Sequence, residues 1–243
     1  MNGAGSGTRA DPLRIRAITI DLDDTLWPIE PVMLRAEQRL DAWLRTHCPP
    51  VADAYPIAAM RALRDRVAAD NPHLAHDFTT QRLMCLRSAL QPHGYGDDHV
   101  DAAFAEFYAA RNEVECYADA VPGLERLAAR FPLVSLSNGN ADLARIGLAR
   151  FFHFSISSRS FGKAKPAAEI FHAACAGLDL PPGDVLHVGD DPLTDVVGAS
   201  QAGMRSAWLN RKGQVWTHAV SPDLTIRDLN ELAHTLEAAA SAA

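Results

Sequence analysis

The sequence predicts an α/β protein with a Rossmann-like three-layer core, built on a parallel sheet, and an inserted all-helical bundle. The run RIRAITI, at residues 14–20, is short and rich in β-branched residues, and it reads as a buried strand. Amphipathic segments without intervening strands then fill residues 28–115. From Tyr117 onward, strand-like and helix-like segments alternate, a pattern typical of parallel sheets with right-handed crossovers.

Composition narrows the class of protein. The chain has 243 residues, of which 48% are hydrophobic and 22% charged, and its net charge of −7 offers no basic field for nucleic acid or an anionic membrane. No apolar run approaches the ~18 residues of a membrane span, and the polar, glycine-rich start does not read as a secretory signal. The cysteines, which form no CxxC pair and no zinc spacing, predict reduced thiols in a cytoplasmic protein; they are Cys48, Cys85, Cys116 and Cys175.

The helical bundle follows the first strand directly. Its helices are expected at residues 31–48, 56–69, 77–91 and 97–112. Breaks between them are expected at Pro49-Pro50, at Asn71-Pro72 and around residues 92–96. A lone strand cannot pair with a bundle, so the first strand must belong to the later sheet. We therefore expect a loose tail (1–12), a discontinuous core (13–27 and 116–243) and a helical cap domain (28–115).

The remainder of the core alternates between the two kinds of element. Helices are expected at residues 121–130, 141–152, 166–178 and 195–204, the third of them closed by Gly177. Strands are expected at residues 131–138, 154–158, 184–191 and 205–210. The chain is expected to end in an edge strand or loop and then a helix, over residues 223–240.

Polar side chains gather where these strands end. Ligands of an open parallel sheet bind beyond the carboxyl ends of its strands. The residues at those ends are Asp21, Asp23, Asp24 and Thr25; Ser137, Asn138, Gly139 and Asn140; Lys163 and Lys165; and Gly189, Asp190, Asp191 and Asp195. Clustered carboxylates need a cation or a proton, and hard dications prefer oxygen ligands. Together with a hydroxyl, backbone amides and a lysine, this inventory fits phosphoryl transfer.

The same residues resemble the motifs of the haloacid dehalogenase superfamily, in particular its magnesium-dependent phosphatases with a helical cap. The matching stretches are DLDDT at 21–25, Ser137-Asn138, Lys165-Pro166, and Gly189-Asp190-Asp191 with Asp195. An aspartate at position 23 fits phosphate esters, since the dehalogenases of this superfamily have another residue there. The likeness covers nearly the whole chain from about residue 14.

The resemblance implies a role for each motif residue. Asp21 would attack phosphorus and form an aspartyl-phosphate, while Asp23 would protonate the leaving oxygen and then deprotonate water. Lys165 would neutralise charge, and Ser137 with the Asn138 and Gly139 backbone would hold the phosphoryl oxygens. Mg²⁺ would be bound by the Asp21 carboxylate, the Asp23 carbonyl and Asp190. Supporting roles fall to Thr25, Asp191 and Asp195, of which either aspartate could contact the metal directly, act through water, or orient Lys165.

The substrate expected from the resemblance is a small phosphorylated metabolite. The sequence stretches DLDDTLW, SNGNA and HVGDDPLTDV, with HDFTTQR in the cap, resemble those of a bacterial branch of the family. Members of this branch act on FMN and on the ribitylamino-pyrimidine phosphate of riboflavin synthesis. Trp27, Asp77 and Arg82 are candidate substrate ligands, although Trp27 could instead pack at the hinge and Arg82 could be structural. A sugar phosphomutase, another metabolite phosphatase and a non-catalytic binding protein remain alternatives. The protein could be a monomer or a homodimer.

The remaining polar residues near the motifs have structural interpretations. His187 is expected to be buried and hydrogen-bonded within its strand. Lys163 competes with Lys165 for the phosphate role, but Pro166 and the helix entry favour Lys165. Asp24 is expected to cap or hydrogen-bond the turn after the first strand.

Overall fold

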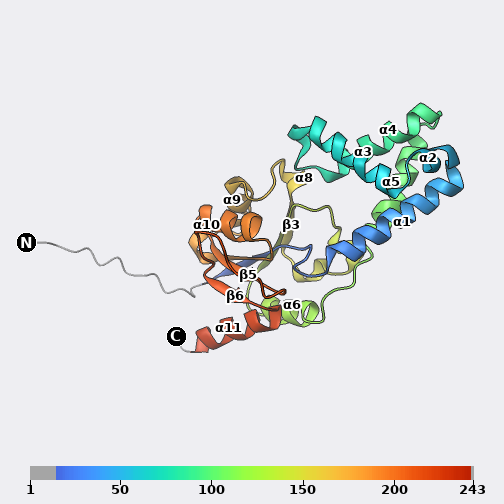
Figure 1. Cartoon of the computed structure of the whole chain (residues 1–243). Helices are drawn as coiled ribbons and strands as arrows, with labels where there is room; N and C mark the ends of the chain where they lie inside the picture. The colour runs from blue at the N-terminus through green and yellow to red at the C-terminus, as the bar shows by residue number, and fades with distance from the viewer. Residues whose placement is uncertain (1–14, 242–243) are drawn as a thin grey trace, which may run out of the picture.

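The structure, a computed structural model, describes residues 15–241, with side-chain burial to residue 239 (Figure 1). The predicted loose tail, 1–12, lies outside the described residues. Within them, one parallel six-stranded sheet has the order β3-β2-β1-β4-β5-β6. Its strands are β1 (Ala17–Ile20), β2 (Leu133–Ser137), β3 (Phe154–Ser157), β4 (Val185–Gly189), β5 (Arg205–Leu209) and β6 (Leu224–Ile226). The predicted fold class is confirmed, with β1 central between β2 and β4.

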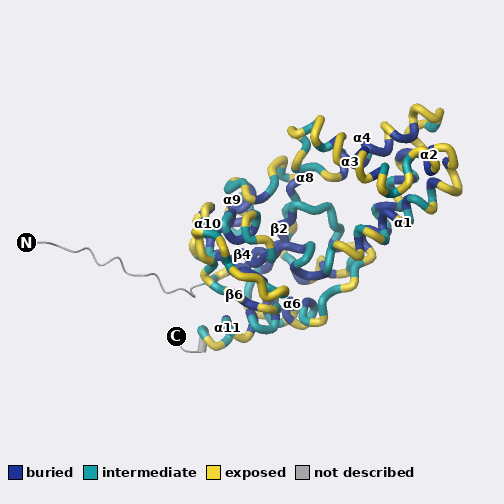
Figure 2. The backbone as a smooth tube through the Cα atoms, viewed as in Figure 1, coloured by how far each residue is buried: buried dark blue, intermediate teal, exposed yellow. Residues whose placement is uncertain are grey.

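Helices cover both faces of the sheet. Successive strand residues point to opposite faces, so the apolar residues of one strand pack against helices on both sides. Ile18 and Ile20 of β1 pack in one cluster with α6 (Ala120–Ala128) and α11 (Leu229–Ser241). Ala17 packs on the other side, in a cluster with α9 (Ala168–Gly177) and α10 (Gly198–Gln201). The strands are buried throughout the middle of the sheet (Figure 2). These two apolar layers hold the strand ends rigidly.

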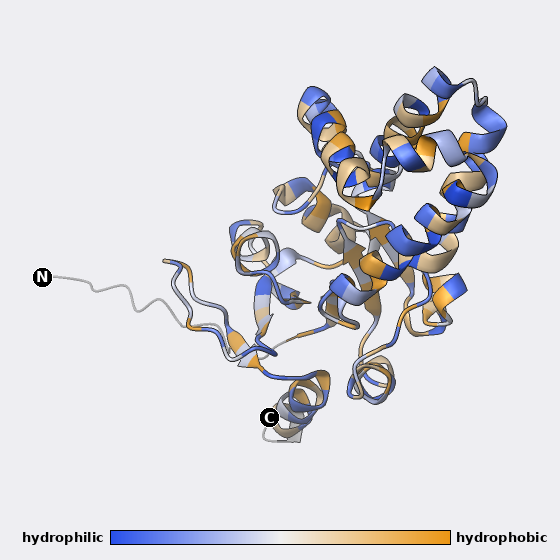
Figure 3. Ribbon diagram, turned by 45° about the vertical axis from the view of Figure 1, so that its right-hand side comes forward, coloured by the Kyte–Doolittle hydropathy of each residue, from blue (hydrophilic) through white to orange (hydrophobic). Residues whose placement is uncertain are grey.

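The bundle has a hydrophobic cluster of its own. It consists of α1 (Ile29–His47), α2 (Pro49–Ala54), α3 (Ile57–Asp70), α4 (Phe78–Leu90) and α5 (Asp97–Arg111). Its buried apolar residues come from all five helices, and hydrophobic and hydrophilic residues alternate along these helices (Figure 3). The chain leaves the sheet after β1 and returns beside the same point, where the Tyr117 amide donates to the Leu26 carbonyl at 2.9 Å. The division at residues 28 and 115 into two domains stays a prediction.

Some elements differ from the expected ones. The expected break at Pro49-Pro50 begins the short helix α2, because proline is tolerated in the first turn. The helix expected over 141–152 is split by Gly147 at φ +85°, a left-handed conformation that closes the first piece. The pieces and the other short turns are α7 (Leu143–Ile146), α8 (Ser158–Phe161), η1 (Pro72–Leu74), η2 (Gln91–His93), η3 (Ala149–Phe151), η4 (Pro182–Asp184) and η5 (Pro192–Val197), the last a π-type turn that leads into α10.

Candidate active site

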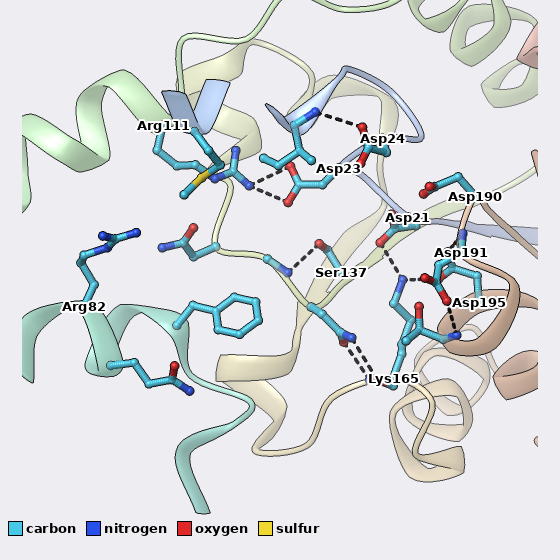
Figure 4. Close-up of a pocket in the computed structure, with 18 of the residues that line it drawn as sticks. Asp21, Asp23, Asp24, Arg82, Arg111, Ser137, Lys165, Asp190, Asp191 and Asp195 are labelled. Carbon is cyan, nitrogen blue, oxygen red and sulfur yellow. Dashed lines mark hydrogen bonds and ion pairs between the residues drawn. The ribbon is translucent and has the colours of Figure 1, made fainter. Parts of the chain in front are cut away.

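The carboxyl ends of β1, β2 and β4 meet at one cavity of about 550 Å³, which helices of the bundle close from the opposite side (Figure 4). The core contributes carboxylates, the β2 loop and a lysine, while α4 and α5 contribute arginines. The cavity-lining residues from the predicted motifs are Asp21, Asp23, Asp24, Ser137, Asn138, Gly139, Lys165, Asp190, Asp191 and Asp195. The sheet topology thus brings together motifs that are far apart in sequence.

Lys165 lies between two buried carboxylates. Its Nζ donates to Asp21 Oδ1 and to Asp195 Oδ1, both at 2.6 Å, and its side chain is 2% exposed. Burial alone would lower the pKa of Lys165, but the charges of Asp195 and Asp21 raise it instead, so the ammonium is charged. The Asn138 side chain fixes this segment, since its Oδ1 accepts from the Lys165 amide at 2.7 Å and its Nδ2 donates to the Lys165 carbonyl at 2.9 Å. Lys163 forms an exposed ion pair with Glu169 instead.

The Asp195 carboxylate contacts three hydrogen-bond donors. Besides Lys165, its carboxylate faces His187 Nε2 at 3.2 Å and accepts from the Asp191 amide at 3.0 Å. Burial would raise the pKa of Asp195, but the charge of Lys165 and the hydrogen bond from His187 hold it well below the usual range. Burial lowers the pKa of His187, so its neutral ring can donate from Nε2 while Nδ1 faces Thr19 Oγ1 at 2.7 Å. These contacts confirm the interpretation of His187 as a buried, hydrogen-bonded residue.

An acidic cluster beside this lysine is suited to a hard cation. Carboxylate oxygens of Asp21, Asp190 and Asp195 lie within 4.8 Å of one another. Burial, followed by the charges of Asp195 and Asp24, raises the pKa of Asp190 to about 7, and burial raises that of Asp21 well above its usual value. Asp195 accepts from the Asp191 amide and faces His187 Nε2 in addition to Lys165, whereas Asp21 shares only the lysine among these donors, so Asp21 and Asp190 are the carboxylates best placed to bind Mg²⁺. Thr25 Oγ1 lies near both, at 3.4 and 3.3 Å.

The β2 loop approaches this cluster very closely. The Gly139 amide donates to Ser137 Oγ at 3.0 Å. A Cβ at Gly139 would lie 2.5 Å from Asp23 Oδ2 and 3.3 Å from Ser137 Oγ, so a larger residue here would displace the Asp23 carboxylate. Backbone amides, a hydroxyl and the side chain of Asp23 therefore border the same small volume, as phosphoryl binding requires.

Asp23 and Asp24 differ in their surroundings. Asp23 accepts from Trp27 Nε1 at 2.8 Å and from Arg111 Nη2 at 2.8 and 2.7 Å. Asp24 adopts φ +57° and accepts from the Ile29 amide at 3.1 Å, which confirms its structural role in the turn before α1. Trp27 is fully buried and does not line the cavity, which supports packing at the hinge over the alternative of stacking on substrate.

On the cap side, the structure separates the two other candidates. Arg82 lines the cavity from α4, is only 6% exposed, and lies 4.1 Å from the centroid of the Phe107 ring. Burial, with the nearby charge of Arg64, lowers its pKa to about 10. Asp77 instead caps α4, accepting from the Thr80 amide at 2.9 Å, and pairs with Arg159. Asp77 does not line the cavity, and its expected contact with substrate is not supported.

Among the cavity residues that the sequence reasoning missed, two bear directly on the site. Arg111, the last residue of α5, reaches the core and pairs with Asp23. Phe78, the first residue of α4, is 48% exposed at the cavity wall. Phe78 lies within the stretch HDFTTQR, so that stretch offered a signal, whereas nothing in the pattern marks Arg111.

A carboxylate cluster, a buried lysine, a hydroxyl and backbone amides meet at the strand ends. This combination is typical of hydrolases that catalyse phosphoryl transfer. The chain belongs to the haloacid dehalogenase-like hydrolase family, whose model matches residues 15–203. The chain is accordingly a phosphoric monoester hydrolase, as predicted from the motifs and as the relatives' names support. None of the described helices is long and apolar enough to cross a membrane.

Two relatives and one solved structure are similar to the chain along almost their whole length. The chain is 32% identical over 227 residues to the 5-amino-6-(5-phospho-D-ribitylamino)uracil phosphatase YigB of Escherichia coli (strain K12), covering 90% of this chain and 95% of that protein. It is 29% identical over 244 residues to a phosphoserine phosphatase of Thermus thermophilus, covering 90% and 98%. A solved structure named 2-haloacid dehalogenase, from Pseudomonas syringae pv. Tomato DC3000, has a TM-score of 0.86 at 35% identity, covering 92% and 99%.

Proposed function

We propose that the chain hydrolyses small phosphate monoesters with Mg²⁺, through an aspartyl-phosphate on Asp21. The observation that carries this proposal is the position of Asp21. Its carboxylate lies at the end of β1, 2.6 Å from Lys165 Nζ, in the cavity that Ser137, Gly139 and Asp190 also line. A charged lysine beside a carboxylate lets an anionic nucleophile and an anionic substrate come together.

The protein groups divide the reaction into two displacements at phosphorus. An oxygen of Asp21 bonds to phosphorus as the ester P–O bond breaks, and Asp23 gives its proton to the leaving oxygen. Asp23 then takes a proton from water, whose oxygen attacks phosphorus and releases phosphate and free Asp21. Lys165 and the Ser137 hydroxyl hold the phosphoryl oxygens, as do the backbone amides of the β2 loop.

Mg²⁺ would be held by Asp21, the Asp23 carbonyl and Asp190, where it supplies positive charge against the phosphoryl group. Asp195 orients Lys165, since its two oxygens already accept from Lys165, His187 and the Asp191 amide. Asp191 accepts from the Leu193 and Thr194 amides at 2.8 and 2.7 Å and so begins η5. We propose supporting roles for both of these aspartates.

The cap favours a leaving group with a flat, polar end. Phe78 offers an exposed ring, and the Arg82 guanidinium points into the cavity from α4 (Figure 4). A heterocycle with carbonyl oxygens would stack on the first and accept hydrogen bonds from the second. FMN and the ribitylamino-pyrimidine phosphate have this chemistry, and the relative YigB is named for the latter. We therefore propose a ribityl phosphate as the substrate. We also propose that the protein acts in the cytoplasm, as a monomer or a homodimer.

A phosphate-release screen tests this proposal. Purified protein with Mg²⁺ is offered FMN, the ribitylamino-pyrimidine phosphate, phosphoserine, a nucleotide and phosphoglycolate, and Asp21→Asn is the inactive control. Fastest release from the two ribityl phosphates, with an Arg82→Met variant that raises their KM about tenfold, supports the substrate proposal. Preference for another ester would overturn the ribityl assignment alone.

A dehalogenase is the second candidate, because the similar Pseudomonas syringae structure bears that name. Chloride release from 2-chloropropionate, in place of phosphate release, would favour it. Isomerised sugar phosphate without net phosphate release would favour a phosphomutase. The motif position of Asp23 supports the phosphatase over the dehalogenase.

A further inference from the structure

Arg111 links the cap to the acid–base residue of the core. It is the last residue of α5, and its side chain is 2% exposed. Its Nη2 donates to both carboxylate oxygens of Asp23, at 2.8 and 2.7 Å, while Trp27 Nε1 donates to Oδ1 from the other side. Two donors from different segments thus fix the orientation of the Asp23 carboxylate, and Figure 4 shows the contact with Arg111.

The other terminal nitrogen of Arg111 has no acceptor. Within residues 15–241, Nη1 is buried and finds no hydrogen-bond partner. Leaving a buried donor unpaired costs about 1–3 kcal/mol, more for a charged group, so such a group calls for an explanation. Arg111 lines the same cavity as Asp21 and Lys165, so this unpaired nitrogen belongs to a side chain that borders the substrate site.

The Arg111 guanidinium borders the loop after β2, whose Ser137 and Gly139 are the expected phosphate-binding residues. A Cβ built on Gly139 would lie 3.3 Å from Arg111 Nη2, 3.3 Å from Ser137 Oγ and 2.5 Å from Asp23 Oδ2. These three side chains therefore surround one backbone position of the β2 loop. A phosphate ester held by that loop would place its oxygens near the arginine fork, whose planar geometry suits phosphate.

We propose that Arg111 binds an oxygen of the substrate's phosphate ester group through Nη1, and positions Asp23 through Nη2. The inference rests on the proposed phosphatase function and adds a residue outside the motifs to it. Because Arg111 belongs to the cap and Asp23 to the core, the acid–base group is oriented correctly only while the cap is seated on the core. The expected ligand of Nη1 is a phosphate monoester or its product, inorganic phosphate.

A positioning role makes a prediction that a structural role does not. Proton transfer by Asp23 matters for an alkyl leaving group, such as that of glycerol 1-phosphate, and little for p-nitrophenolate, which leaves without a proton. General acid–base help is typically worth about 10² to 10⁴ in rate, so loss of Arg111 should slow the alkyl ester about 100-fold and the p-nitrophenyl ester less than about fivefold. A merely structural loss would slow both equally.

The experiment compares Arg111→Met and Arg111→Lys with the control Arg87→Met. Arg87 is also a cap arginine, but its exposed ion pair with Asp97 lies away from the cavity. We measure kcat and KM for both esters, melting temperature, and the Kd of inorganic phosphate by calorimetry. The expected results are the selective loss of alkyl turnover, partial rescue in Arg111→Lys, and a Kd raised about tenfold in Arg111→Met. The control should match the wild type.

A double variant checks the route through Asp23. In an Asp23→Asn background, Arg111→Met should lower kcat for glycerol 1-phosphate little further, because the group that it positions is gone. Equal losses for both esters, or an unchanged phosphate Kd in a folded Arg111→Met protein, would overturn the inference. A wild type that releases phosphate from neither of these esters nor from the two ribityl phosphates refutes the proposed function instead, and the phosphate Kd still decides whether Arg111 binds phosphate.

Discussion

Replacing each of two neighbouring lysines by methionine probes the charge balance of the site. Lys165 is buried between Asp21 and Asp195, whereas Lys163 pairs with Glu169 in solvent, with both side chains more than half exposed. Removing one partner of a buried ion pair costs about 3–5 kcal/mol, while an exposed pair is worth about 0–1 kcal/mol. At about 2–4 °C per kcal/mol for a chain of this size, Lys165→Met should lower the melting temperature by about 6–20 °C and Lys163→Met by no more than about 4 °C.

The same pair of variants carries a pH signature. Lys165 holds the pKa of Asp195 below its usual range, so the stability from this pair is present above the unfolded pKa of about 3.9 and is lost as pH falls through the folded value. The difference in melting temperature between wild type and Lys165→Met, followed by circular dichroism during heating, should thus stay constant from about pH 7 to about pH 5 and narrow as the pH falls through about 3.9 and below. Phosphate release should fall at least about 100-fold in Lys165→Met and stay unchanged in Lys163→Met. Equal melting temperatures for the two variants at neutral pH would refute this reasoning.

Three further predictions concern the metal, the hydrogen bonds of Asp119 within the core, and Gly189. A chelator should abolish phosphate release and added Mg²⁺ should restore it; turnover that survives chelation contradicts the metal assignment. Asp119 accepts from Arg211 and from the Leu229 amide, which outweigh burial and lower its pKa. Asp119→Asn should therefore cost about 1–2 kcal/mol in urea unfolding at about pH 7, and this cost should shrink as the pH falls below the usual carboxyl pKa of about 3.9. Gly189→Ala would place Cβ 2.2 Å from Asp195 Oδ2 and should cost about 1–3 kcal/mol with lost turnover, and a fully active, stable variant would contradict it.

Local patterns predicted the fold because they coincide with its packing. The apolar residues of β1 alternate between two real core clusters, and the strand ends place the polar motifs at one edge, as the rule for parallel sheets requires. Glycine at 147 was not recognised as a helix end, so one predicted helix proved to be two short pieces.

Contacts between distant segments were harder to predict. Trp27 had two interpretations, stacking on substrate and packing at the hinge. Its burial decides between them, and that burial depends on how the cap meets the core. Asp77 was a candidate ligand because the stretch HDFTTQR resembles a branch of the family, yet a residue before a helix often caps it. Arg111 was missed because its partner Asp23 is 88 residues away in sequence, and no periodicity reports such a pair.

The central claim is that Asp21 carries the phosphoryl group. Rapid quenching of the enzyme during turnover of p-nitrophenyl phosphate, followed by borohydride reduction, converts an aspartyl-phosphate into homoserine, which mass spectrometry locates in the chain. The account predicts homoserine at position 21 in the wild type and none in Asp21→Asn. Continued turnover with position 21 unmodified, or modification at another carboxylate, would contradict it.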